Sequence, residues 1–295
     1  AVMDTQTPTV VVSHDMPPEL FVDVSATLRS MGVAVTTDGC TPSTSRTKVI
    51  VVVSPKGGSG KTAVSSNLAV ALAQRHPGRV VAVDLDVQFG DLGLALSLAP
   101  ERTLAQLARA NQIDATTVKL HLTSSSHGLF VLAGATDPVD ADSVGHAHVS
   151  QVLPLLAESF DYVIVDTPAG LDERTLAALE CATDVLLVSS LDVTSIRSLR
   201  KAHDALDHLG IEAERRLILN RSDSKVGLDP SDAEEVMGMK IACSIPSSRD
   251  VPLSLNLGTP VVASEPKSAV ARQLQHLAEL YAPAETRPAR KGWRR

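Results

Sequence analysis

The chain has 295 residues, of which 44% are hydrophobic and 21% charged, and this composition excludes wholesale disorder. Aromatic residues make up only 2% and the formal net charge is −7, which argues against modules that stack nucleic-acid bases and against a protein that coats DNA. No apolar run approaches the roughly 20 residues of a membrane-spanning helix. Because residues 1–16 also lack the basic and apolar regions of a signal peptide, we expect a cytoplasmic protein.

The first 46 residues differ in pattern from the rest of the chain. Their composition predicts a strand, a helix and a second strand, at Val10–Ser13, Pro18–Ser30 and Val33–Thr36. A Thr-Pro-Ser-Thr-Ser stretch that follows is typical of a linker. We therefore predict a βαβ-like extension over residues 1–46, a single large domain over 47–283 and a basic tail over 284–295.

In the large domain, short β-branched runs alternate with helical patterns. Seven runs predict buried strands at Lys48–Ser54, Arg79–Asp84, Leu129–Leu132, Asp161–Asp166, Val185–Ser189, Arg216–Asn220 and Ile241–Ser244. The helices between them are predicted to begin near Lys61, Ser150, Glu173, Thr194 and Ser231, and an amphipathic helix is predicted over Lys267–Tyr281. This alternation predicts an α/β fold: a doubly wound, mostly parallel sheet with helices on both faces and a ligand at the carboxyl ends of the strands.

A glycine-rich loop, Ser-Pro-Lys-Gly-Gly-Ser-Gly-Lys-Thr over residues 54–62, joins the first of these strands to the first helix. Strand, loop and helix in this order are typical of a P-loop, whose glycines let successive N–H groups face phosphate oxygens. Lys61 would reach the β- and γ-phosphates, and the Thr62 hydroxyl would hold Mg²⁺. We expect nucleotide contacts from Gly57, Gly58, Ser59, Gly60, Lys61, Thr62 and Ala63. The alternative, an ordinary glycine turn, rarely carries Gly-Lys-Thr at the start of a helix.

Three acidic residues lie at or just after the ends of two of the predicted strands. Asp84 and Asp86 are two residues apart in an extended segment, so their carboxylates lie on the same side. We predict that Asp84 serves the Mg²⁺ side and that Asp86 orients the attacking water of ATP hydrolysis. Another apolar strand ends in Asp166, which is the Walker B pattern and predicts a second Mg²⁺ ligand. Alone, such acids are often solvated loop residues, but the P-loop upstream favours a metal-dependent ATPase site.

The loop departs from the general P-loop pattern, because Pro55 stands where the first glycine is expected and a second lysine, Lys56, follows it. In this respect the sequence resembles the deviant Walker A ATPases of the MinD/ParA superfamily, whose loop reads Lys-Gly-Gly-x-Gly-Lys-Thr. The segment Asp166–Gly170 matches that group's Asp-Ser/Thr-Pro-Ala-Gly. The resemblance extends over about residues 47–282, with its motifs in the same order.

The resemblance implies an ATP-dependent homodimer in which Lys56 crosses the interface to the phosphates of the partner's nucleotide. It implies a switch that senses the γ-phosphate around Gly170. It also implies that Asn220 reads the adenine edge and that the backbone around Pro246 flanks the base. The catalytic set would then be Lys56, Lys61 and Asp86, with ATP and Mg²⁺ as cofactors.

The segment Gln88–Leu92 is most similar to the CpaE/TadZ branch, ATPases that place pilus-secretion machinery at a cell pole, and related proteins are labelled septum-site determining. This implies a switch that positions a protein complex of a pilus, secretion or division machine. The tail carries a Trp among basic residues, at Arg287, Arg290, Lys291, Trp293, Arg294 and Arg295. Such a tail suits weak contact with an anionic membrane at the inner face or pole, but it lacks the apolar half of a membrane helix, so a solubilising tail is favoured.

Two other functions remain open on the sequence. One is a DNA-partitioning ATPase of the ParA type, although the basic surface that specific DNA binding needs is not evident, so specific DNA is not the expected partner. The other is a scaffold that binds nucleotide without turnover, which the three acids Asp84, Asp86 and Asp166 argue against.

Overall fold

The computed structural model describes residues 9–12, 34–37, 47–224 and 228–282. Its main sheet has eight strands in the order β10-β9-β8-β3-β7-β4-β6-β5, and all neighbours are parallel except β5 and β6. The strands are β3 (Lys48–Val53), β4 (Val80–Asp84), β5 (Thr123–Ser124), β6 (Phe130–Leu132), β7 (Tyr162–Asp166), β8 (Asp184–Ser190), β9 (Glu214–Asn220) and β10 (Ile241–Ile245). The predicted α/β class and all seven predicted strands are confirmed; β5, only two residues long, was not predicted.

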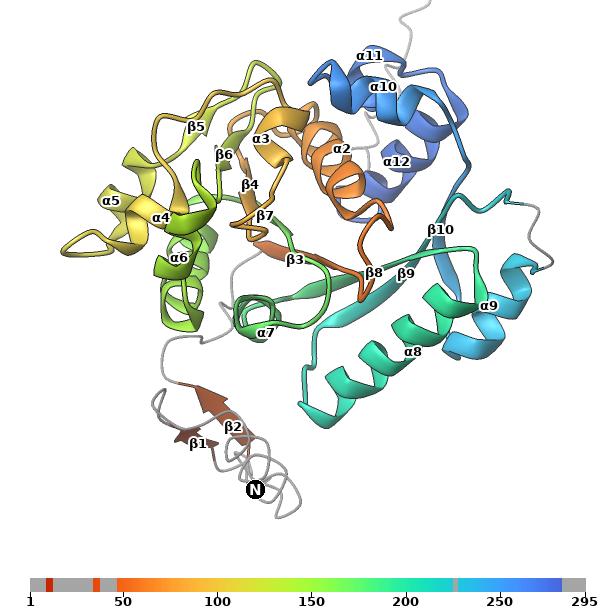
Figure 1. The fold of residues 1–295 in the computed structure, drawn as a ribbon, viewed down its shortest axis with the longest axis horizontal. Coiled ribbons are helices and arrows are strands. Elements are labelled where there is room, and N and C mark those ends of the chain that lie inside the picture. The colour runs from red at the N-terminus through yellow and green to blue at the C-terminus, as the bar shows by residue number, and fades with distance from the viewer. Residues whose placement is uncertain (1–8, 13–33, 38–46, 225–227, 283–295) are drawn as a thin grey trace, which may run out of the picture.

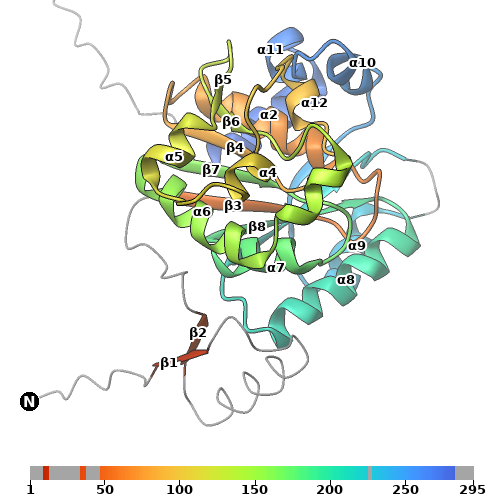
Figure 2. The ribbon, with the colours of Figure 1, turned by 60° about the vertical axis from the view of Figure 1, so that its left-hand side comes forward.

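Helices cover both faces of this sheet (Figure 1). One layer holds α2 (Lys61–Ala73), α3 (Leu92–Ala95), α10 (Asp250–Asn256), α11 (Val261–Ser264) and α12 (Ala269–Glu279). The other holds α4 (Leu104–Ala108), α5 (Ala115–Leu120), α6 (His146–Ser159), α7 (Glu173–Glu180), α8 (Val193–His208) and α9 (Pro230–Met237), with a 3-10 turn at Pro138–Ser143. The turned view in Figure 2 shows the sheet between the two layers.

The central strand β3 shows why the sheet must be covered on both sides. Val49, Val51 and Val53 pack into one hydrophobic core, while Ile50 and Val52 pack into the other. Successive side chains of a strand point to opposite faces, so a strand that is apolar at every position can only be satisfied between two layers. The site at the end of β3 is therefore held by a strand that is buried on both faces.

The helix α6 begins at His146, four residues before the predicted start near Ser150. The sequence there lacks a Ser, Thr, Asp or Asn cap, and Gly145 takes that position with its N–H donated to His148 Nδ1 at 3.1 Å. Pro154 lies inside the helix, which continues because its flanking turns are buried in the core. His146 and His148 therefore lie in the first turn of this helix.

The N-terminal strands β1 (Thr9–Val12) and β2 (Ala34–Thr37) pair in parallel as a separate two-stranded sheet, each within one residue of its predicted position. The predicted helix Pro18–Ser30, the linker and the tail 284–295 lie outside the described residues, and the domain boundaries stay a prediction. None of the helices in the described ranges has both the length and the apolar character needed to cross a bilayer.

A buried acid ties the strands together at the edge opposite the P-loop. Asp184, at the start of β8, is fully buried, and its carboxylate pairs with Lys48 Nζ of β3 at 3.0 Å and with Arg216 Nη1 of β9 at 2.5 Å. The Arg216 guanidinium also lies over the Tyr281 ring, 5.0 Å from its centroid. These contacts connect three neighbouring strands to the segment that follows α12.

Replacing Asp184 with Ala should lower the free energy of unfolding by about 3 kcal/mol or more, because it leaves two cations without their buried partner. Urea unfolding would measure this. The matched control is Asp204→Ala, which breaks an exposed ion pair with Arg200 on α8 and should cost less than about 1 kcal/mol. Equal losses in the two variants would show that Asp184 does not organise this edge.

Candidate functional site

The predicted P-loop lies between β3 and α2, at the carboxyl edge of the central parallel strands. Gly58 and Gly60 adopt the left-handed backbone region, with φ of 72° and 97°. Glycine is favoured there because it has no Cβ to oppose a positive φ. A Cβ at Gly60 would in addition overlap the side-chain amide of Asn220. Of the three glycines in the loop, the backbone geometry thus requires glycine at Gly58 and Gly60 but not at Gly57.

Below this loop, Asp166 at the end of β7 is buried and accepts two hydrogen bonds from α2. Thr62 Oγ1 donates to Oδ2 at 2.7 Å and Ser65 Oγ donates to Oδ1 at 2.8 Å. The structure therefore brings together Thr62 and Asp166, the two residues predicted for Mg²⁺ on the strongest motifs. Ser65 was not predicted, although its place three residues after Thr62 on the same helix face would have indicated it.

Burial governs the electrostatics of this cluster. It raises the pKa of Asp166 to about 6, against the hydrogen bonds from Thr62 and Ser65 and the charge of Lys61. Burial also raises the pKa of Asp84 well above its usual range, with Asp166 adding to the effect. Burial lowers the pKa of Lys61, and the charges of Asp166 and Asp86 offset only part of that shift. The cluster thus offers carboxylate and hydroxyl oxygens and carries buried negative charge, and both properties suit a hard divalent cation such as Mg²⁺.

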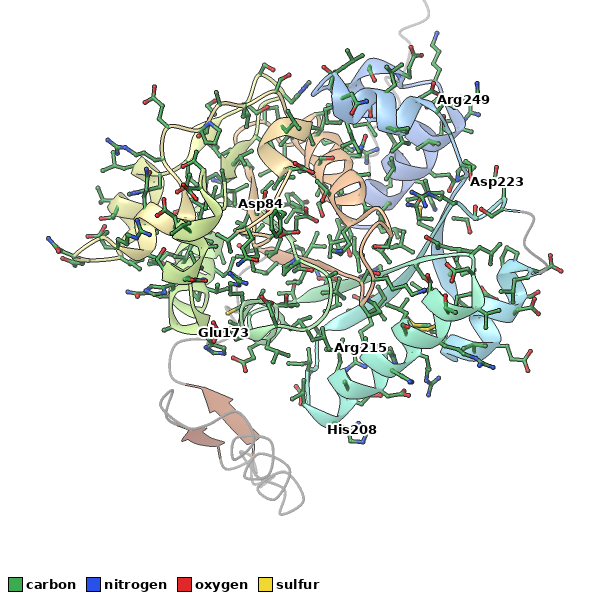
Figure 3. All side chains as sticks on the ribbon, in the orientation of Figure 1. Asp84, Glu173, His208, Arg215, Asp223 and Arg249 are labelled. Atoms are coloured by element: carbon green, nitrogen blue, oxygen red, sulfur yellow. The ribbon has the colours of Figure 1, made fainter. Side chains whose placement is uncertain are left out.

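Asp84, labelled in Figure 3, is buried and lies directly across the β4–β7 register from Asp166. Its two carboxylate oxygens accept the N–H groups of Asp86 at 3.1 Å and of Leu92 at 3.2 Å. Gly90 passes so close to this carboxylate that a Cβ there would overlap it. Asp84 thus organises the segment that carries Asp86, which is half-buried.

The second lysine of the loop, Lys56, is held within the same chain. Its Nζ donates to Thr194 Oγ1 at 2.5 Å and lies 3.7 Å from Asp192 Oδ1. Asp192 caps α8 by accepting the Ser195 N–H at 2.8 Å. Burial acts to raise the pKa of Asp192, but hydrogen bonds from Ser195 and Thr194 and the charge of Lys56 hold it low, at about 2. This contact joins the P-loop to the start of α8.

The two residues predicted for the base also lie at this edge. Asn220 ends β9 beside Ile245, the last residue of β10, and Pro246 follows directly. The side chain of Asn220, however, is directed at the P-loop: Nδ2 donates to the Ser59 carbonyl at 2.7 Å. Sequence reasoning missed this contact because the two residues are 161 positions apart.

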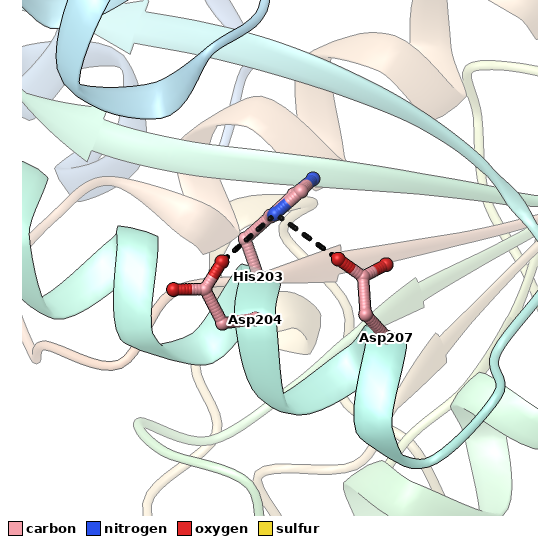
Figure 4. Close-up of side chains that lie close together, drawn as sticks. All are labelled: His203, Asp204 and Asp207. Atoms are coloured by element: carbon pink, nitrogen blue, oxygen red, sulfur yellow. Dashed lines mark ion pairs between the residues drawn. The ribbon is translucent and has the colours of Figure 1, made fainter.

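A second polar cluster lies on α8, away from the P-loop. His203 Nδ1 is 3.7 Å from Asp204 and 3.9 Å from Asp207 (Figure 4). Both carboxylates already have a guanidinium partner, since Arg200 pairs with Asp204 at 2.8 Å and Arg215 with Asp207 at 2.5 Å. Because these arginines already supply the positive charge that a metal ion would bring, we assign no metal to this cluster.

Comparison with known proteins identifies the family. The sequence model of the AAA domain family matches residues 47–217, more than half of the chain. The septum site-determining protein MinD of Neisseria meningitidis serogroup B is 30% identical over 238 residues, covering 75% of this chain and 86% of that protein. The chain belongs to the MinD/ParA superfamily of ATPases.

Solved structures of this superfamily share the fold. A ParA family ATPase from Chlorobium tepidum TLS has a TM-score of 0.74 at 26% identity, covering 79% of this chain and 98% of that one. MinD from Pyrococcus horikoshii OT3, solved as a complex with Mg-ADP, has a TM-score of 0.72 at 27% identity, covering 79% and 95%. The predicted family is confirmed; the CpaE/TadZ branch within it stays a prediction.

The raised pKa of Asp166 predicts how stability depends on pH. An unfolded aspartate has a pKa of about 3.9, whereas the value in the folded chain is about 6. Between these values the folded state binds more protons, so the free energy of unfolding should fall as the pH rises from about 4 to about 6. Asp166→Asn should flatten that slope in urea unfolding of the nucleotide-free protein.

Asp161→Asn is the matched control for this measurement. The hydrogen bond from Arg79 lowers the pKa of Asp161, so this carboxyl titrates below the window and its loss should leave the slope unchanged. If Asp166→Asn and the wild type have equal slopes, Asp166 is not protonated in the folded state near pH 5.

Proposed function

We propose that this protein is a Mg²⁺- and ATP-dependent dimerising ATPase, a switch that positions a partner complex in the cell. The observation that carries the proposal is the hydrogen bond from Thr62 to the buried Asp166 carboxylate at the end of the P-loop, with Lys61 beside it. This arrangement combines the two things that phosphoryl transfer needs from a protein, a place for a divalent cation and a fixed positive charge. The Mg-ADP complex of the Pyrococcus horikoshii relative supports the choice of ligand.

Residues 57–63 would hold the phosphates, and Asn220 and Pro246 would lie on the base side. Thr62, Asp84 and Asp166 would hold Mg²⁺, which neutralises phosphate charge when it is bound. Asp86 would orient the attacking water, because Asp84 holds the backbone of its segment against the buried edge of the sheet. Asp84 would therefore have two roles: it would help to hold Mg²⁺, and it would fix the backbone of the segment that carries Asp86.

Dimerisation would place Lys56 against the phosphates of the partner's nucleotide. In the single chain Lys56 and Asp192 are both about two-fifths exposed, at 40% and 42% of the side chain. An ion pair so open to water contributes at most about 1 kcal/mol. Contact with a triphosphate across an interface would outweigh it, so the cis contact would not prevent the trans one.

The partner is proposed to be a protein of a pilus, secretion or division machine, in keeping with the septum-site role named for the relatives and with the CpaE/TadZ likeness of Gln88–Leu92. Phe89, in that segment, is 75% exposed and lies three residues after Asp86. An exposed aromatic side chain there suits a partner that regulates hydrolysis. We propose a cytoplasmic protein that can associate peripherally with the inner face of the membrane or with a cell pole.

The likeness to the Chlorobium tepidum ParA family ATPase keeps DNA partitioning as a second candidate. A salt-dependent shift of DNA in the presence of ATP would favour it, since phosphate contacts release counterions.

Lys56→Ala should retain ATP binding and lose ATP-dependent dimers, because its proposed target lies on the other subunit. Sedimentation velocity with ATP and Mg²⁺ would measure the dimer. Lys201→Ala, which removes an exposed lysine from α8, is the matched control and should dimerise as the wild type does. Unchanged dimers in Lys56→Ala would refute the trans role.

Asp86→Ala should keep ATP bound while hydrolysis falls by roughly 10²-fold or more, because the attacking water loses its anchor. The ATP-bound dimer should then accumulate, as followed by phosphate release beside sedimentation. Lys61→Ala should abolish ATP binding altogether. The matched control for Asp86→Ala is Asp91→Ala, which removes an exposed acid from the same segment and should hydrolyse ATP normally. Normal hydrolysis in Asp86→Ala together with slow hydrolysis in Asp91→Ala would assign the attacking water to Asp91. A wild type that does not hydrolyse ATP with any partner would favour a scaffold that binds nucleotide without turnover.

A further inference from the structure

The peptide between Ser59 and Gly60 is fixed from outside the P-loop. Asn220 Nδ2 donates to the Ser59 carbonyl at 2.7 Å. No peptide bond in the described chain is cis, so the N–H of Gly60 points in the opposite direction from this carbonyl. The orientation of that N–H, away from Asn220, is therefore set by a side chain of β9.

The orientation of the Asn220 amide follows from its neighbours. A carbonyl oxygen can only accept, so the group that faces Ser59 must be the NH₂. The other end, Oδ1, accepts the N–H of Arg221 at 3.0 Å, and an N–H can only donate. Arg221 has a φ of 53°, an uncommon value for a residue other than glycine. Both ends of the amide are thus engaged, and the side chain cannot turn without losing a hydrogen bond.

Gly60 needs such a restraint because glycine does not hold its own conformation. Its carbonyl accepts the Val64 N–H at 2.9 Å, which anchors the following peptide to the first turn of α2. The preceding peptide has no helical partner, and glycine permits the rotation that would turn it over. A turned peptide would place a carbonyl oxygen where an N–H should meet a phosphate.

We propose that Asn220 is a positioning residue for phosphate binding: its hydrogen bond to Ser59 fixes the Ser59–Gly60 peptide so that the Gly60 N–H faces the nucleotide's phosphates. The inference rests on the proposed nucleotide binding and deepens it. Asn220 then contributes to binding of the triphosphate, whatever contact it makes with the base.

Inorganic triphosphate separates the two roles, because it has no base. Its affinity, and that of ATP, would be measured with Mg²⁺ by displacement of a fluorescent ATP analogue. Asn220→Ala should weaken triphosphate by about tenfold or more, as expected for one hydrogen bond to a charged group, and should weaken ATP by at least as much. Asn220→Asp should weaken both further, since a carboxylate would face the Ser59 carbonyl. Asn111→Ala, the same truncation at an exposed site, should change neither.

A second measurement reads the peptide itself and does not depend on how tightly triphosphate binds. Ser-Gly occurs once in the sequence, at residues 59 and 60. Carbonyl-¹³C serine combined with ¹⁵N glycine therefore gives a single correlated amide signal, that of Gly60. In the wild type this proton should move downfield when Mg-ADP is added, as an N–H does on bonding to phosphate, and in Asn220→Ala the shift should be lost or much reduced.

The proposal is overturned if Asn220→Ala weakens ATP but leaves triphosphate unchanged, which would make Asn220 a reader of the base alone. It is equally overturned if the Gly60 signal shifts as far in Asn220→Ala as in the wild type. A wild type that binds neither ATP nor triphosphate would instead refute the proposed function, and that result is distinct because it does not involve the variant.

Discussion

The buried carboxylate of Asp166 is the constraint on which the rest of the site depends. It is 1% exposed, and its two oxygens accept from Thr62 and Ser65 on the helix that follows the P-loop. The parallel register of β4 and β7 places Asp84, a second buried acid, directly opposite. Two such groups cannot both be ionised in a dry environment without a compensating charge. The fold therefore concentrates buried negative charge where the phosphate loop ends and α2 begins, and a bound cation would compensate that charge.

Three segments meet around this charge, and each is held by a residue from a neighbouring element. Asp84 holds the Asp86 segment through backbone N–H groups, Asn220 holds the P-loop through the Ser59 carbonyl, and the start of α8 holds Lys56. These contacts differ in burial: the hydrogen bond from Lys56 to Thr194 is exposed, the one from Asn220 to Ser59 is partly buried, and the one from Leu92 to Asp84 is buried. A site made of loops restrained in this way suits a protein whose proposed output is a change of state.

The predictions succeeded where a local pattern determines local structure. The strands were found because β-branched runs that are apolar at every position fit only a sheet buried on both faces. The P-loop was found because glycines at fixed spacing before Lys61 have few other uses. The early start of α6 was missed because Gly145 caps it without a cap-forming side chain. The short helices α3, α4, α5, α10 and α11, of four to seven residues, are too brief for a period to be read.

By itself the sequence determined the fold class, the superfamily and the residues from which a nucleotide site would be built, because these depend on patterns that are contiguous along the chain. Only the tertiary structure decided which of those residues contact one another. Lys56 meets Thr194 across 138 positions and Asn220 meets Ser59 across 161. Such pairs follow from the order of strands in the sheet, which brings the ends of β3, β8 and β9 to one edge. The spacing of residues along the chain does not determine that order, so the hydrogen bond between Asn220 and the P-loop could be found only in the folded structure.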